Sequence, residues 1–145
     1  MPLTRKGAKR ADASIILNLH RESLFLKRTL LSIDNALRVA IAAGFTVELV
    51  AILDRTDGDT RTVLAEHDIG LYADVHMLEV DNGSLGLSRN DGISKSSGEI
   101  ILTADGDDLI SENFVLDTVT FAQSQGPDAL YFAEYLLAFG ASYHI

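Results

Sequence analysis

The 145-residue chain has no cysteine and no tryptophan, and only two of its residues are proline. The lack of cysteine excludes a disulfide scaffold, a thiolate zinc site and a cysteine nucleophile. No apolar run reaches the roughly 18 to 20 residues that a membrane-spanning helix needs. Residues 1–12 hold a basic cluster with no apolar signal core behind it, so we expect a cytoplasmic protein.

Basic residues are few and unevenly placed. The chain has 12 Lys and Arg against 21 Asp and Glu, a net charge of −9, and no Lys or Arg follows Lys95. A protein this acidic does not bind a bare phosphate backbone without a cation, so we expect no nucleic-acid partner. Apolar residues, by contrast, make up 47% of the chain, which is enough to fill a core.

Short apolar runs alternate with amphipathic stretches. The apolar runs predict strands over residues 13–19, 46–53, 75–80, 99–103 and 129–139. The amphipathic stretches predict helices over residues 23–43, 60–67, 87–96 and from about 111 to 125. This alternation predicts an α/β fold, a mostly parallel sheet covered by helices on both faces. We expect residues 1–12 to form a disordered basic leader and residues 13–145 to form one domain.

Polar residues follow three of the predicted strands, at the edge where open parallel sheets bind ligands. Asn18 and His20 follow the first strand, Asp54 the second, and the acidic turn, residues 105–108, the fourth. The carboxylates of this turn repel one another by roughly 3 kcal/mol per pair, at about 5 Å and an effective dielectric near 20. Mg²⁺ or Mn²⁺ would relieve that repulsion, whereas the alternative is an acidic loop with a helix-capping Asp.

Asp54 also has two interpretations. It either forms only the turn after its strand, or it accepts a hydrogen bond from a ribose hydroxyl or a base N–H. Several other α/β classes are disfavoured because their motifs are missing: Gly-x-Gly-x-x-Gly, the Walker A loop and the Gly-x-Ser-x-Gly elbow. The four histidines show no metal-binding spacing.

Three segments resemble family 2 glycosyltransferases with a GT-A fold. ASIILNLHRES resembles the family's opening V-S-I-I-I-P-x-Y-N, and VELVAILDRTDGDT resembles its second strand and Asp-rich turn. Residues 83–108, GSLGLSRNDGISKSSGEIILTADGDD, resemble G-x-x-x-A-R-N-x-G-I-x-x-A-x-G-E-Y-I-x-F-L-D-x-D-D. The resemblance covers about residues 13–139 and implies a nucleotide-diphospho-sugar transferase domain that is incomplete at its C-terminus.

The resemblance implies a nucleotide-binding role for several residues. Asp54 matches the Asp that recognises the base, often uracil, and the loop from Asn18 to His20 matches the segment that touches the base. This loop lacks the family's usual Pro and Tyr. Arg89 and Asn90 match the Arg-Asn pair that lines the nucleotide pocket.

The resemblance also implies the chemistry. Asp105 and Asp107 match the DxD motif, whose first Asp commonly contacts the ribose and whose last holds Mn²⁺ or Mg²⁺ on the diphosphate. It implies a UDP-sugar donor, an unknown acceptor, and inversion at the anomeric carbon with a carboxylate base. The family's base lies well downstream of DxD. Glu134 is the late acid near a predicted strand, and we expect it to be structural.

Two other functions stay open. One is a non-catalytic module that binds a nucleotide sugar or a partner with the same fold. The other is a nucleotidyltransferase-like enzyme, disfavoured because the Gly-rich first loop of that class is missing. We expect the chain alone to bind the donor without turnover. The apolar fifth strand predicts self-association or a missing C-terminal segment that covers it.

Overall fold

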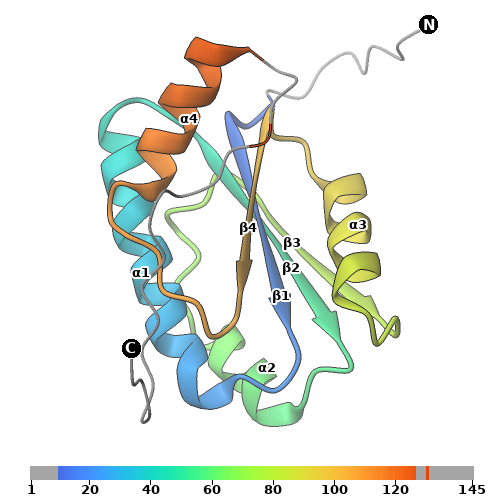
Figure 1. Ribbon diagram of the computed structural model, residues 1–145. Helices are drawn as coiled ribbons and strands as arrows, with labels where there is room; N and C mark the ends of the chain where they lie inside the picture. The colour runs from blue at the N-terminus through green and yellow to red at the C-terminus, as the bar shows by residue number, and fades with distance from the viewer. Residues whose placement is uncertain (1–9, 127–129, 131–145) are drawn as a thin grey trace, which may run out of the picture.

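The computed structural model describes residues 10–126 and residue 130 (Figure 1). The predicted fifth strand and Glu134 lie outside the described residues. The elements follow in the order β1 (Ala13–Leu19), α1 (Ser23–Ala42), β2 (Val47–Asp54), α2 (Gly58–Ala65), β3 (Val75–Val80), α3 (Leu85–Lys95), β4 (Ile100–Asp105) and α4 (Phe114–Gln125). Among the described helices, none combines the length and apolarity that crossing a membrane requires.

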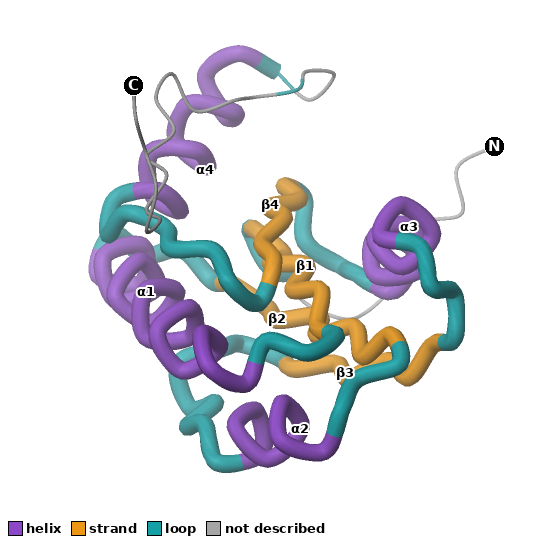
Figure 2. Tube along the Cα trace, turned by 60° about the horizontal axis from the view of Figure 1, so that its bottom comes forward, coloured by secondary structure: helices purple, strands orange, loops and turns teal. Residues whose placement is uncertain are grey.

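The described strands form one parallel sheet in the order β3-β2-β1-β4. Figure 2 shows α1, α2 and α4 on one face of this sheet and α3 on the other. The predicted α/β architecture, with a parallel sheet covered on both faces, is therefore confirmed. Because all four strands run the same way, their carboxyl ends meet at one edge.

The core lies on both faces of the two central strands, and every residue of β1 is buried. On one face α1 contributes a seam of four buried residues: Leu26, Leu30, Ile33 and Leu37. On the other face a smaller cluster lies under α3: Ile16, Val50 and Ile52. Ile41 continues the same helical spacing, but it is 39% exposed. Ile41 lies fifteen residues beyond Leu26, and at about 100° per residue its side chain points about 60° away from that of Leu26. The buried Ala40 lies at the core instead.

Two boundaries differ from the sequence prediction because side chains cap backbone groups. Helix α2 begins at Gly58 rather than Thr60, since the Asp57 carboxylate accepts the backbone N–H of Thr60 at 2.9 Å. Asp12, which we placed in the leader, is fixed to the fold, because its carboxylate accepts the backbone N–H of Thr46 at 2.6 Å.

Glycine has a low helix propensity, but the structure gives Gly92 a packing role in α3. A Cβ at this position would lie 2.4 Å from Cδ1 of Ile52 and 2.7 Å from Cγ2 of Ile16. Glycine therefore lets α3 approach the sheet closely, which places the side chains of that helix near the ends of β1 and β2.

Candidate functional site

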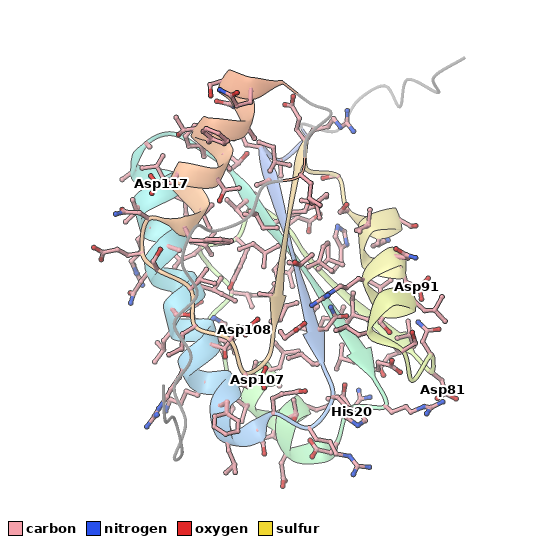
Figure 3. All side chains as sticks on the ribbon, in the orientation of Figure 1. His20, Asp81, Asp91, Asp107, Asp108 and Asp117 are labelled. Atoms are coloured by element: carbon pink, nitrogen blue, oxygen red, sulfur yellow. The ribbon has the colours of Figure 1, made fainter. Side chains whose placement is uncertain are left out.

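The carboxyl ends of β1, β2 and β4 surround a pocket of about 220 Å³. Figure 3 shows His20, Asp107 and Asp108 at this edge of the sheet. Nine residues line the pocket: Asn18, Leu19, His20, Glu22, Asp54, Leu85, Ser88, Asp105 and Asp107. The fold thus brings together five of the residues that the sequence singled out, from three separate strand ends.

Asp54 anchors the loop between β3 and α3. Its Oδ1 accepts the backbone N–H groups of Asn82 at 3.0 Å and Gly83 at 3.1 Å, and its Oδ2 accepts the Ser88 hydroxyl at 2.9 Å. The Gly83 N–H lowers the pKa of Asp54 most, and together with the donors from Ser88, Asn82 and Ser84 it outweighs the rise caused by burial. Asp54 also lines the pocket, and a carboxylate oxygen can accept more than one hydrogen bond, so a ligand can approach the same carboxylate.

Arg89 reaches from α3 to Asp105 at the end of β4. Its Nη2 donates to Oδ1 at 2.9 Å and to Oδ2 at 3.0 Å. The sequence showed no cation beside the acidic turn, and the fold supplies one from 16 residues earlier. Neither Arg89 nor the exposed Asn90, the two halves of the predicted pair, is among the residues that line the pocket, and Arg89 reaches it only through Asp105.

The three acids of the acidic turn have different surroundings. Asp108 accepts the backbone N–H of Asp105 at 3.1 Å, so its carboxylate stabilises the turn itself. Asp107 is exposed at the pocket, and within residues 10–126 no group hydrogen-bonds its carboxylate. The carboxylates of Asp107 and Asp105 are hard oxygen donors, which fit Mg²⁺ or Mn²⁺.

The acidic turn is held against the first strand and helix by Gly106. Its N–H donates to the carbonyl of Asn18 at 3.1 Å, and its carbonyl accepts the hydroxyl of the buried Thr29 at 2.9 Å. A Cβ here would lie 2.8 Å from Cδ2 of Leu19. Glycine therefore allows the turn to lie directly on the end of β1.

Asn18 carries an unpaired amide into the pocket. The residue is 7% exposed, and among the described residues neither its Oδ1 nor its Nδ2 has a hydrogen-bond partner. A buried polar group without a partner costs about 1–3 kcal/mol, so a ligand that offers both an acceptor and a donor would be stabilised here.

His20 is fixed beside Asn18 by its own backbone and ring. Its N–H donates to the Glu22 carboxylate at 2.6 Å, and its Nδ1 lies 2.8 Å from the Asp54 carbonyl. A carbonyl only accepts, so Nδ1 carries the proton, and Nε2 is left to meet a ligand.

Sequence reasoning missed three of the pocket residues: Glu22, Leu85 and Ser88. Ser88 precedes Arg89 inside the long segment that resembles the family, so its position offered a signal. Leu85 lies in the same segment and Glu22 in the first of the three segments, but neither follows a predicted strand directly, and only the folded loops bring them to the strand ends.

Comparison with known proteins gives three findings. The model of Glycosyl transferase family 2 matches residues 14–135 of this chain. The crystal structure of S. aureus TarS 1–349 superposes with a TM-score of 0.64 and 18% identity, over 78% of this chain and 32% of that one. The crystal structure of S. aureus TarS 1–349 in complex with UDP-GlcNAc superposes with a TM-score of 0.63 and 20% identity, over 78% of this chain and 31% of that one.

A third structure, TarS 1–349 in complex with UDP, gives a TM-score of 0.63 and 17% identity, over 78% of this chain and 32% of that one. At sequence identities this low, the superposition shows that the proteins share a fold and nothing further. This chain spans about a third of the length of these TarS structures. Among curated proteins, none matches it significantly.

Proposed function

Because this chain belongs to Glycosyl transferase family 2, we propose that its pocket binds a nucleotide-diphospho-sugar and presents the sugar to an acceptor hydroxyl. The observation that carries the proposal is the convergence of five predicted residues on one pocket. Two of them, Asn18 and Asp107, have no hydrogen-bond partner for the amide or the carboxylate among the described residues. The donor we propose is a UDP-sugar. The TarS structures with UDP and UDP-GlcNAc support that choice through the shared fold.

The base of the donor would lie between the ends of β1 and β2. Asn18 offers one acceptor and one donor, which match the adjacent N–H and carbonyl of uracil. Asp54, which lines the pocket, would accept a further N–H or a ribose hydroxyl. His20 would flank the base with its ring, fixed by the carbonyl of Asp54.

The diphosphate would lie against the acidic turn. Both are negatively charged, so they repel each other unless a cation lies between them. Asp107 and Asp105 would hold a divalent cation there, which neutralises the oxygens of the diphosphate as the sugar leaves. Arg89 keeps the carboxylate of Asp105 in place through its two contacts. The unpaired carboxylate of Asp107 is the group most available to the cation.

We propose an inverting transfer, in which the acceptor hydroxyl attacks the anomeric carbon opposite the leaving diphosphate. That step needs a carboxylate to take the hydroxyl proton. Of the acids that line the pocket, Glu22 is occupied by the N–H of His20, and Asp54 by the loop before α3. The base is therefore not assigned to a described residue, and Glu134 lies outside them.

Calorimetric titration with UDP, in Mn²⁺ and in EDTA, tests the proposal. We expect binding in Mn²⁺ that EDTA abolishes and that Asp107→Asn removes without unfolding the chain. Asp117→Asn, which changes an exposed carboxylate on α4, is the matched control and should bind like the unmodified protein. Equal UDP affinity in EDTA and in Mn²⁺ would refute the metal-dependent site.

A further inference from the structure

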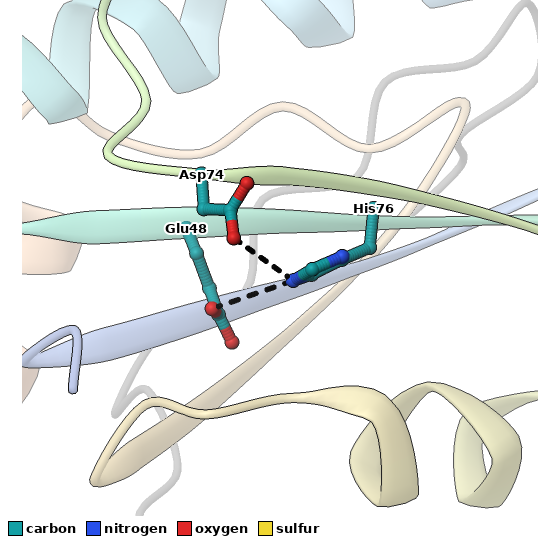
Figure 4. Close-up of side chains that lie close together, drawn as sticks. All are labelled: Glu48, Asp74 and His76. Atoms are coloured by element: carbon teal, nitrogen blue, oxygen red, sulfur yellow. Dashed lines mark ion pairs between the residues drawn. The ribbon is translucent and has the colours of Figure 1, made fainter. Parts of the chain in front are cut away.

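A second group of metal-ligating side chains lies at the opposite end of the sheet from the pocket. Glu48 and His76 are the second residues of β2 and β3, and Asp74 directly precedes β3. His76 pairs with Val50 in the parallel ladder, so the alternation of side chains places all three on the face that α3 covers. Figure 4 shows both carboxylates directed at Nε2 of His76.

The distances among these three side chains suit one small ion. Nε2 of His76 lies 3.2 Å from Oδ2 of Asp74 and 4.0 Å from Oε2 of Glu48. One ligand atom from each residue lies within 4.8 Å of the other two. Ligand atoms around tetrahedral Zn²⁺, with bonds of about 2.0–2.1 Å, lie about 3.4 Å apart. Small side-chain rotations therefore bring all three within bonding distance of a shared ion.

Glu48 is held in the orientation that a ligand needs. Its Oε1 accepts the Ser14 hydroxyl at 2.6 Å and the backbone N–H of Ser97, and its Oε2 accepts the Ser97 hydroxyl at 2.6 Å. Burial raises the pKa of Glu48, but the hydrogen bonds from Ser14, Ser97 and Gly98 together lower it below its ordinary value. The carboxylate is thus ionised and fixed by outer partners, and Oε2 keeps a lone pair that faces His76.

The three side chains of the cluster differ in how much of each is exposed to solvent. The side chain of Glu48 is 1% exposed, that of His76 26%, and that of Asp74 64%. An ion can therefore enter from the side of Asp74, with water as its fourth ligand. One imidazole and two carboxylates form a donor set that suits Zn²⁺.

We propose that Glu48, Asp74 and His76 bind a divalent transition metal such as Zn²⁺, separately from the nucleotide pocket. The ion would link β3, an edge strand of the described sheet, to the buried strand β2. Through Glu48 it would also tie in the loop between α3 and β4, which Ser97 belongs to. The site is then a structural one, and it stabilises the end of the sheet that the donor does not reach.

Metal titration of the chain after removal of bound ions tests the proposal. We expect ZnCl₂ to bind by calorimetry and raise the midpoint of thermal unfolding, and CoCl₂ to shift the NMR signals of the His76 ring. His76→Gln and Asp74→Asn should each weaken Zn²⁺ binding at least about tenfold, since each removes one ligand. Asp74 is largely exposed, so its variant should fold even if the His76 variant does not.

Two controls separate this site from other acids. Asp107→Asn removes a carboxylate of the nucleotide pocket, and Asp117→Asn removes an exposed one on α4. Both variants should keep the Zn²⁺ affinity of the unmodified protein. Zn²⁺ binding that is absent, that survives both His76→Gln and Asp74→Asn, or that disappears with Asp107→Asn would overturn the proposal. The three side chains would then form only a polar cluster at this end of the sheet.

Discussion

Asp54 performs two tasks that the sequence presented as alternatives. As a turn residue, it fixes Asn82, Gly83 and Ser88 through hydrogen bonds. As a pocket residue, it is one of the side chains that a ligand would meet. The bonds within the protein orient the carboxylate, and this orientation is what a base-recognising residue requires.

Asp54→Asn should therefore weaken both folding and UDP binding. We expect a loss of about 1–3 kcal/mol in the free energy of unfolding at pH 7, because an amide cannot accept all three donors. Since the pKa of Asp54 is lower in the folded state, its stabilisation is present above the unfolded pKa, about 3.9, and is lost as the pH falls through the folded pKa. Urea unfolding at pH 7, 5 and 3 measures the difference, which should persist at pH 5 and shrink at pH 3.

The exposed Glu66→Gln serves as the control for that series and should change stability little at any pH. If Asp54→Asn weakened UDP binding but left unfolding unchanged at every pH, the anchoring role of Asp54 would be wrong.

The sequence could predict which polar residues follow the buried strands, but not which side chains they contact. Asn18, Asp54 and Asp105 come after apolar runs, and a parallel sheet must bring such positions to one edge. The contact between Arg89 and Asp105 was not predictable, because it depends on how α3 lies across the sheet. The cluster at His76 was also missed, since its ligands come from two strands 26 residues apart and show no motif.

At the scale of elements, the sequence predicted strands better than helix ends. The first and third predicted strands agree with β1 and β3 residue for residue, because bounded apolar runs define buried strands. Helix α3 begins at Leu85, two residues before the predicted start, and it continues through Gly92. The requirement that α3 pack closely on Ile16 and Ile52 outweighs the low helix propensity of glycine.

Gly92→Ala should push α3 away from the sheet. A Cβ there would meet Ile52 at 2.4 Å, and overpacking of this kind costs about 1–3 kcal/mol. Because α3 also carries Ser88 and Arg89, UDP binding should weaken with it. Thermal unfolding and calorimetry of the same preparation measure both effects.

Gly86→Ala is the matched control in the same helix, because a Cβ at Gly86 meets nothing within 4 Å. It should leave binding unchanged and stabilise the chain by up to about 1 kcal/mol through helix propensity. Should both alanine variants behave alike, close packing of α3 would not be what positions the pocket.

At the scale of the whole molecule, the proposed function gives the described residues the donor side of a transfer reaction. General-base assistance contributes about 10²- to 10⁴-fold, and positioning of the acceptor contributes more. We therefore expect these 145 residues to bind UDP-GlcNAc or another UDP-sugar but to transfer the sugar negligibly. A panel of acceptors, assayed for transfer and for release of UDP, checks this expectation. Rapid transfer would show that an acid within the chain, such as Glu134, serves as the base.

The proposed function requires that a cation and a nucleoside diphosphate bind together at the acidic turn. NMR of the isotope-labelled chain, with UDP and a small amount of Mn²⁺, is the sharpest test of this requirement. Paramagnetic Mn²⁺ broadens the signals of nuclei close to it. We predict selective broadening of residues 105–108 and 18–22 that requires UDP, whereas any broadening of residues 48 and 74–76, which form the separate metal cluster, should not depend on UDP. Broadening that is absent from residues 105–108, or that is the same without UDP, would contradict a donor site built on Asp105 and Asp107.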